Sequence, residues 1–158
     1  MMLTATPRGW FSWDYALSSK NDHLADIDLS WWREKGTLTV DGQHYGVYRE
    51  RPLSGKFILE SAGTIVASAG KPSSLTRRLL IEDAAGRQYE LKPRGMFSRT
   101  FELHAGSTVV GSLSAKGVFS RGMNVDLPET LPLRLAVRVF VVWLTVMLWK
   151  REAEAAAG

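Results

Sequence analysis

Histidines are the side chains best suited to acid–base or metal chemistry near neutral pH, and this chain has three, His23, His44 and His104. They are far apart in the sequence, and no two have the spacing of metal ligands on one helix or hairpin. The chain contains no Cys, which excludes thiolate catalysis, disulfides and Cys-ligated metals. We therefore expect three structural histidines, no metal site and no cofactor.

The carboxylates give no stronger sign of catalysis. Asp26 and Asp28 are two residues apart, and on a strand this spacing puts both on one face, so we expect a solvent-exposed pair rather than a metal site. Asp22 and His23 follow two serines, but nothing in the sequence orients them as a catalytic triad. Phosphate-binding loops, nucleophile elbows and zinc-protease motifs are absent. We expect a protein that is not an enzyme.

Basic side chains are the better candidates for a binding site. Lys and Arg outnumber Asp and Glu by 20 to 16, which gives a net charge of +4. The candidate anion-binding or lipid-headgroup residues are Lys71, Arg77, Arg78, Lys92, Arg94, Arg99, Lys116 and Arg121. If their connections converge, each charge adds about 1 kcal/mol of attraction to an anionic membrane. The alternative is a set of scattered, solubilising charges.

Two aromatic residues next to these basic residues are candidate interfacial anchors. Phe97 and Phe119 each lie two residues before an arginine, although aromatic residues in strands more often belong to the core. Nucleic acid is not an expected partner, because acidic residues are interleaved with the basic ones and no known binding module appears. A protein partner is the alternative to a phospholipid surface.

The elements that must position these side chains are short strands. Apolar and polar residues alternate between turn-forming residues, and Asp41-Gly42 is a strong hairpin signal. The predicted strands are 10–18, 24–31, 37–40, 44–48, 56–60, 64–68, 78–82, 88–92, 100–104, 108–113, 117–120 and 123–126. Residues 57–68 resemble 101–112, and 95–99 resemble 117–121, as in a sheet built of similar hairpins. Such a series predicts a sandwich or a barrel.

The segment 131–149 is apolar on nearly every side, so either protein or lipid must surround it. About twelve strands enclose more volume than their own side chains fill, and a helix of this length suits that space. We predict a helix over 130–151, with Thr130 as its cap and Pro132 in its first turn. Its predicted core residues are Leu135, Val139, Val142, Trp143, Val146 and Trp149.

Two arginines bear on the choice between protein and lipid. Arg134 and Arg138 share one face of the predicted helix near its start, where a barrel mouth would leave them in water. In a transmembrane span each would cost about 2.5–3.5 kcal/mol near the bilayer centre. The internal helix is therefore favoured, and the alternative is a tail-anchored protein in which 131–149 crosses the bilayer.

The order of these elements resembles the tubby C-terminal-like superfamily, which includes the LURP-one-related proteins and the phospholipid scramblases. The resemblance rests on short sequence motifs such as Gly55–Leu59 and Gly86–Leu91 and on the hydrophobic C-terminal helix. It implies a mainly β fold, a closed antiparallel barrel of about twelve strands around that helix. For function it implies association with membrane phospholipid.

The chain length, 158 residues, suits a single domain covering 1–158, with a short polar tail at 152–158. The first ten residues lack the apolar stretch of a signal peptide. We therefore expect a cytoplasmic location, with contact to the inner face of the membrane. The sequence leaves the oligomeric state open.

Overall fold

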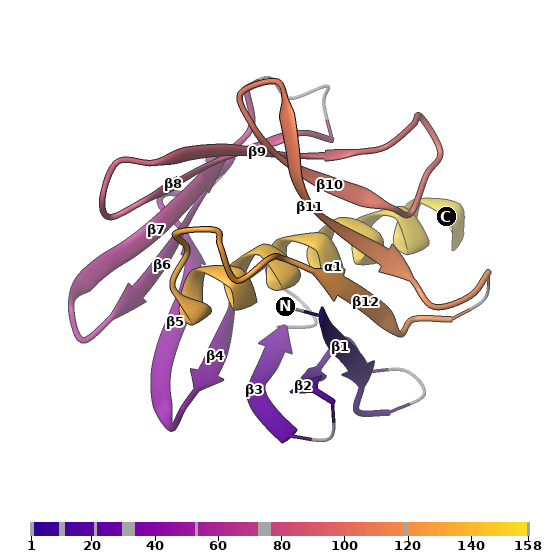
Figure 1. The fold of residues 1–158 in the computed structure, drawn as a ribbon, viewed down its shortest axis with the longest axis horizontal. Coiled ribbons are helices and arrows are strands. Elements are labelled where there is room, and N and C mark those ends of the chain that lie inside the picture. Colours follow the sequence, from indigo (N-terminus) through magenta and orange to yellow (C-terminus); the bar gives the residue numbers. More distant parts are fainter. Residues whose placement is uncertain are drawn as a thin grey trace.

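The computed structural model describes residues 2–9, 12–20, 22–29, 34–52, 54–72, 77–118 and 120–157. Within these residues, twelve antiparallel strands close into a barrel and one helix runs through it, as predicted (Figure 1). The elements are β1 Met2–Pro7, β2 Tyr15–Ser19, β3 Asp22–Leu29, β4 Gly36–Val40, β5 Gln43–Arg49, β6 Lys56–Ser61, β7 Thr64–Gly70, β8 Leu79–Asp83, β9 Gln88–Pro93, β10 Phe101–Ala105, β11 Thr108–Ala115, β12 Met123–Asp126 and α1 Leu135–Ala157.

Each strand pairs with its neighbours in the sequence, and β1 closes the barrel by pairing with β12 through registers such as Leu3↔Val125. The connections therefore alternate between two rims. One, which we call the exit rim, carries the connections 8–14, 30–35, 50–55, 71–78, 94–100 and 116–122. The other, which we call the linker rim, carries 20–21, 41–42, 62–63, 84–87, 106–107 and the linker 127–134 that leads into α1.

Alternation along the strands separates the core from the solvent. In β3, Ala25, Ile27 and Leu29 are buried, whereas Asp26 and Asp28 lie on the outer face. The tight turns between strands also follow the sequence signals. Asp41 and Gly42 both have positive φ, of 50° and 75°, which is the backbone form that a two-residue hairpin requires.

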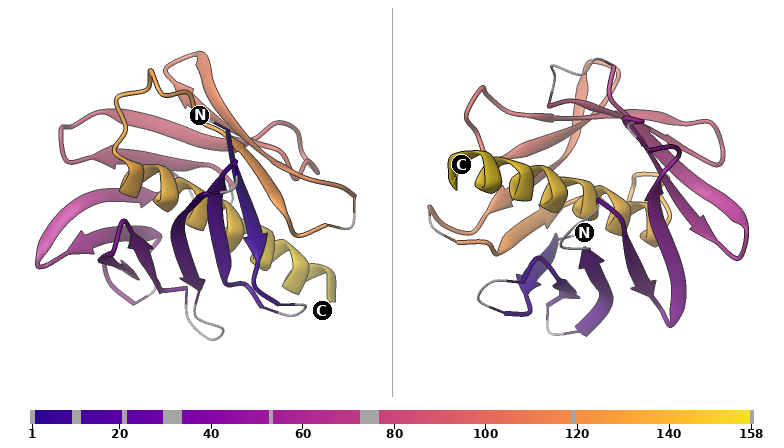
Figure 2. Two further views of the ribbon diagram at one scale, coloured as in Figure 1. Left: turned by 60° about the horizontal axis from the view of Figure 1, so that its bottom comes forward. Right: turned by 180° about the vertical axis from the view of Figure 1, so that it is seen from behind.

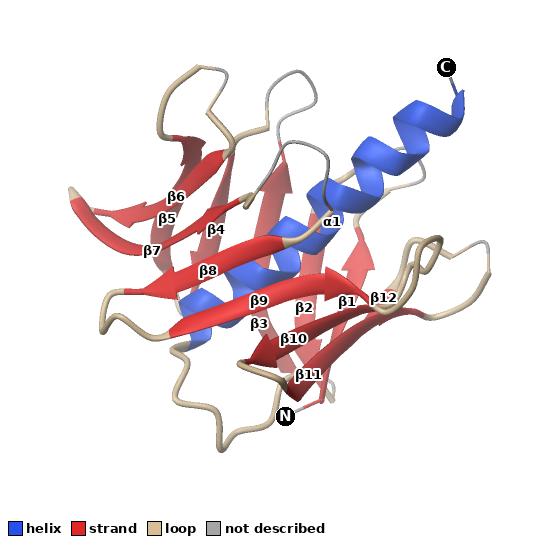
Figure 3. Ribbon diagram, turned by 90° about the horizontal axis from the view of Figure 1, so that it is seen from above, coloured by secondary structure: helices blue, strands red, loops and turns tan. Residues whose placement is uncertain are grey.

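Helix α1 enters at the linker rim, fills the lumen and leaves at the exit rim, where its C-terminal turns project beyond the strands (Figures 2 and 3). All side chains from Ala136 to Lys150 are buried. The side chain of Trp143 packs edge-on against Phe57 of β6, with 5.6 Å between ring centroids. The apolar surface of the segment is thus covered by the barrel wall.

The predicted helix core is confirmed with one difference. Five of the six residues are at most 3% exposed: Val139, Val142, Trp143, Val146 and Trp149. Leu135 is partly buried and packs against the core as the first residue of the helix. Among the described residues, no helix has both the length and the hydrophobicity that a bilayer span requires.

Two of the predicted strands were placed incorrectly. The barrel begins with β1 at Met2–Pro7, which was not predicted, and β2 starts only at Tyr15 rather than at residue 10. Residues 10 and 11 lie outside the described part of the chain. The predicted strand 117–120 is wrong: its described residues lie in the connection 116–122 and not in a strand. A Gly-rich, basic connection contains enough apolar residues to imitate a strand.

The helix ends were also predicted incorrectly. Helix α1 starts at Leu135, so Thr130 is not its cap, and Pro132 lies in the linker rather than in the first turn. It continues to Ala157, so residues 152–157 are not a tail; Glu and Ala are good helix formers. Arg134 is exposed as expected, but Arg138 is only 4% exposed. Its guanidinium donates to four backbone carbonyls of the linker, which replace water.

Candidate functional site: the basic exit rim

Seven of the eight predicted basic residues lie in three successive connections of the exit rim. The connections 71–78, 94–100 and 116–122 contain Lys71, Arg77, Arg78, Arg94, Arg99, Lys116 and Arg121, and no Asp or Glu. The eighth, Lys92, lies in β9, where its ammonium is 3.4 Å from the Glu90 carboxylate. The fold therefore brings the predicted connections together, which periodicity alone does not determine.

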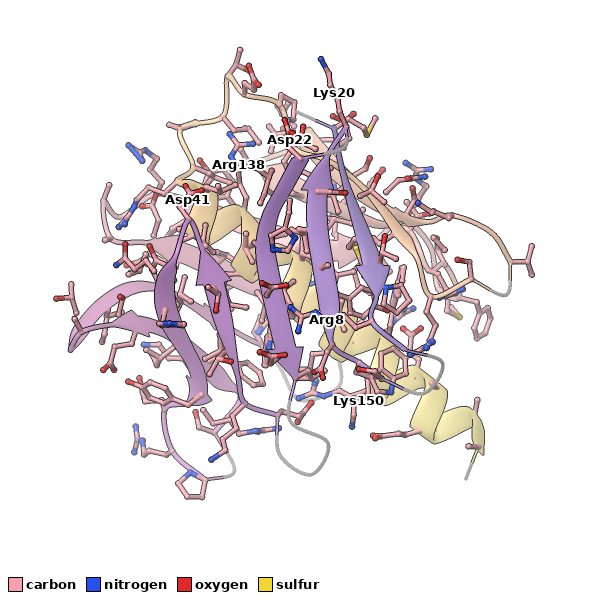
Figure 4. All side chains as sticks on the ribbon, turned by 90° about the horizontal axis from the view of Figure 1, so that it is seen from below. Arg8, Lys20, Asp22, Asp41, Arg138 and Lys150 are labelled. Carbon is pink, nitrogen blue, oxygen red and sulfur yellow. The ribbon has the colours of Figure 1, made fainter. Side chains whose placement is uncertain are left out.

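The two rims differ in charge. In the five short connections of the linker rim, the charged residues are Lys20, Asp41 and Arg87. Figure 4 shows the two ends of the barrel: Lys20, Asp41 and Arg138 lie towards one end, and Arg8 and Lys150 lie towards the other. Positive charge is thus concentrated where the helix leaves the barrel.

Two arginines of the exit rim link neighbouring connections. The Arg77 guanidinium donates to the carbonyls of Met96 and Ser98, at 2.7 and 3.0 Å. The Arg99 guanidinium donates in the same way to Val118 and Ser120, at 3.3 and 2.8 Å. Each arginine therefore holds the backbone of the next connection around the barrel through charge-assisted hydrogen bonds.

A third arginine continues this series across the seam of the barrel. Arg121 donates to the carbonyls of Gly9 and Ser12 in the connection between β1 and β2. The Tyr15 hydroxyl donates to the Arg121 carbonyl at 2.8 Å. Burial raises the pKa of Tyr15 to about 12, although the charges of Arg121 and Arg99 oppose the rise. The phenol is therefore a hydrogen-bond donor at physiological pH.

All three arginines are also stacked near aromatic rings. The guanidinium carbon lies 5.3 Å from the Phe101 ring centroid for Arg77, 4.4 Å from that of Trp149 for Arg99, and 5.5 Å from that of Trp13 for Arg121. Such cation–π contacts fix the orientation of the guanidinium plane. We call Arg77, Arg99 and Arg121 the brace arginines.

The connections share one construction. In 94–100 the amide of Arg94 donates to the carbonyl of Thr100 at 2.8 Å, and in 116–122 the amide of Lys116 donates to that of Gly122 at 3.0 Å. In both, a serine hydroxyl, of Ser98 or Ser120, accepts the amide proton two residues later. These bonds close each connection on itself.

The last turns of α1 attach the rim to the core. The Trp149 indole donates to the Arg99 carbonyl at 3.0 Å, and Glu152 forms an ion pair with Arg77. Burial raises the pKa of Glu152, and the charge of Arg77 partly offsets that rise. Extension of the helix past residue 151 thus has a structural role, because it supplies Glu152 as a partner to Arg77.

A second cluster lies on the same rim beside Phe57. Glu34 pairs with both Arg49 and Arg151, the latter at 2.8 Å through Nη2. Burial opposes ionisation of Glu34, but the hydrogen bonds and charges of the two arginines outweigh it, and the pKa is lowered. The pKa of Lys71 is lowered first by burial and then by the charge of Arg151.

The remaining predicted cations are more exposed. The Arg94 guanidinium is 3.1 Å from Glu102, and this hydrogen bond lowers the pKa of the carboxyl. Arg78 lies 3.7 Å from Glu90 on the outer face. The side chain of Lys116 is exposed and has no ion pair with any carboxylate of the described residues. The charges of Arg94, Arg78 and Lys116 therefore face solvent.

Apolar side chains stand at the tips of two of these connections. Met96 is 80% exposed, Phe97 is 91% exposed and Val118 is 83% exposed. Phe97 is thus an exposed residue rather than a core residue. Phe119, the other predicted anchor, lies outside the described residues.

Each histidine contacts a different side chain. His23 contacts Asp26, His44 contacts Thr39, and His104 contacts Glu102. Asp26 pairs with Arg8 on the outer face, and Asp28 lies 3.7 Å from the same guanidinium. Within the described part of the chain, no three His, Asp or Glu side chains gather in a way that suits a metal ion.

The sequence contains a signal for the brace arginines. Arg77, Arg99 and Arg121 are spaced 22 residues apart, each two residues before an even-numbered strand. The similarity between 95–99 and 117–121 reflects this spacing. The spacing alone does not show that each guanidinium bonds the backbone of the next connection rather than a ligand.

The basic exit rim is therefore a built surface of braced connections, outward-facing cations and exposed apolar tips. No protein-family model matches the sequence, and no curated protein is significantly similar to it.

Proposed function

We propose that this protein is a non-enzymatic barrel that binds the surface of membranes rich in anionic phospholipid through its exit rim. The observation that carries the proposal is the charge of three successive connections, which contain seven Lys or Arg and no Asp or Glu. The acidic partners of these cations, Glu90, Glu102 and Glu152, come from β9, β10 and α1 rather than from the connections themselves. An excess of positive charge at one end of the molecule favours a planar, anionic partner.

The individual contacts refine which residues contribute. The brace arginines bond to the protein itself, so they hold the rim in shape and add to its potential. The cations that can reach a headgroup are the outward-facing ones, above all Arg94 and Lys116. Each basic residue near an anionic membrane adds about 1 kcal/mol, and salt screens this attraction over about 8–10 Å.

The resemblance to the tubby C-terminal-like superfamily points in the same direction, because that group is associated with membrane phospholipid. Under this proposal the protein acts as a peripheral protein at the inner face of the membrane.

Flotation with vesicles tests the proposal. We expect the protein to float with vesicles of phosphatidylcholine and phosphatidylserine at 20 mM salt, to float less at 500 mM salt, and not to float with pure phosphatidylcholine. Absence of binding to the anionic vesicles at 20 mM salt contradicts the proposal.

A matched pair of double variants locates the surface. Arg94→Gln with Lys116→Gln removes two charges from the exit rim, and Lys20→Gln with Arg134→Gln removes two from the linker rim. We expect the first pair to weaken vesicle binding about tenfold or more, and the second to change it little. Equal effects of both pairs would indicate that net charge, rather than the exit rim, controls binding.

A further inference from the structure

We propose that the exit rim does more than attract headgroups: Met96, Phe97 and Val118 insert into the boundary between headgroups and acyl chains and set the barrel end-on to the membrane. This inference rests on the proposed membrane binding. The three residues form two apolar tips on the neighbouring connections 94–100 and 116–122.

Their exposure is unusual for a soluble surface. Single exposed apolar residues are common, but three large side chains with 80–91% exposure on adjacent connections leave almost no apolar area covered. Elsewhere on the described surface, the exposed large apolar residues Met2, Tyr48, Ile65, Leu80 and Val109 are only 36–61% exposed. The tips therefore protrude further from the protein than those side chains do.

The protrusion is enforced by the backbone. Arg77 holds the carbonyls of Met96 and Ser98, and Arg99 holds those of Val118 and Ser120. Because the carbonyls of Met96 and Ser98 are bonded by Arg77, the backbone that carries Phe97 is held at the tip of the connection. The tips are thus presented before any partner arrives, which lowers the ordering cost of insertion.

The surroundings of the tips identify the occupant as lipid. Arg94 and Lys116 begin the two connections, so each tip has a cation at its base, and neither connection contains an acidic residue. If the apolar tips reach the acyl chains, the cations at their bases lie at the depth of the anionic headgroups, which is the order of groups in a bilayer surface. Narrow, separate tips also suit a fluid surface, which needs no shape complementarity.

The absence of Cys from the chain makes the inference directly measurable. Val118→Cys carries an environment-sensitive fluorophore at a tip of the exit rim. Val109→Cys carries the same fluorophore at the start of strand β11, beside the linker rim. The two positions have the same native residue and are both exposed, at 83% and 50%. On addition of phosphatidylserine vesicles, we expect a blue shift and quenching by brominated acyl chains at position 118 only.

Serine variants provide the affinity readout. We expect Phe97→Ser to weaken vesicle binding about tenfold at 150 mM salt, because burial of one large apolar side chain corresponds to at least that factor. Val118→Ser should also weaken it, whereas Val109→Ser should not. The remaining binding of Phe97→Ser should depend more steeply on salt, because only the electrostatic part is left.

The outcomes separate the two proposals. If the native protein binds anionic vesicles but the label at 118 stays in water and Phe97→Ser binds normally, membrane binding stands and insertion is refuted. If the label at 118 shifts only with a protein partner and not with vesicles, the tips form a protein-docking surface and insertion is refuted. If the native protein does not bind vesicles at any salt concentration, both proposals fail.

Discussion

Replacement of Arg138 by Met tests how the helix is locked into the barrel. The Arg138 guanidinium donates to the carbonyls of Leu133, Leu127, Pro128 and Leu131, at 3.1, 2.5, 2.9 and 2.9 Å. The linker thereby wraps around a buried cation at the start of α1. Burial lowers the pKa of Arg138, but the carbonyl bonds compensate the charge with dipoles.

The expected magnitude follows from those bonds. Met is similar in length and apolar, so Arg138→Met removes the donors without opening a large cavity. The Pro128 carbonyl keeps a backbone bond from Leu131, at 3.1 Å, but the other three lose their bond to the guanidinium. At about 1 kcal/mol for each of these, the loss is about 3 kcal/mol, before a partial gain because no charge has to be buried.

Urea unfolding, followed by the fluorescence of buried tryptophans, measures this change. With a urea dependence of about 2 kcal/mol per molar, 3 kcal/mol lowers the midpoint by about 1.5 M. The control is Arg134→Met, the same change one turn earlier on an exposed side chain, which should alter stability by at most about 0.5 kcal/mol. Equal midpoints for the two variants would refute a stabilising role for the carbonyl bonds.

Two further predictions concern the strands and the exit rim. Gly36→Ala should destabilise the protein by about 1–3 kcal/mol, because the new Cβ would lie 1.9 Å from the Asp28 carbonyl oxygen. The control Gly46→Ala, whose Cβ would have no atom within 4 Å, should be neutral or stabilising. Thermal unfolding compares the two variants, and similar melting temperatures would contradict the close packing at Gly36. Glu34→Gln should destabilise the protein at pH 7 by about 1.5–3 kcal/mol, because its two arginine partners lose the carboxylate. Since the folded-state pKa of Glu34 lies below its ordinary value of 4.5, the native protein should lose this advantage as pH falls below about 4.5 and through the lowered pKa. A constant difference between native protein and variant from pH 7 to pH 2 would disprove the role of its charge.

The sequence by itself determined the class of fold. Strand alternation, as in β3, specifies which side chains face the lumen, because the side-chain period of a strand is two. Because segment 131–149 is apolar on all sides, it must be surrounded by apolar groups, and a barrel of about twelve strands needs a segment to occupy its lumen. The helix therefore predicts the barrel, and the barrel predicts the helix. Basic connections were also identifiable, because charge is read directly from residue types.

Only the tertiary structure decided how those residues are used. Met2–Pro7 becomes a strand because it closes the ring between β2 and β12, a long-range pairing that local pattern does not encode. Arg77 and Arg99 look like ligand-binding residues in the sequence, but their guanidinium groups reach carbonyls 19 to 21 residues away, across a strand pair. Arg138 is buried because the linker 127–134 folds back over its guanidinium and offers carbonyl oxygens in place of water, a path that the residue pattern does not encode.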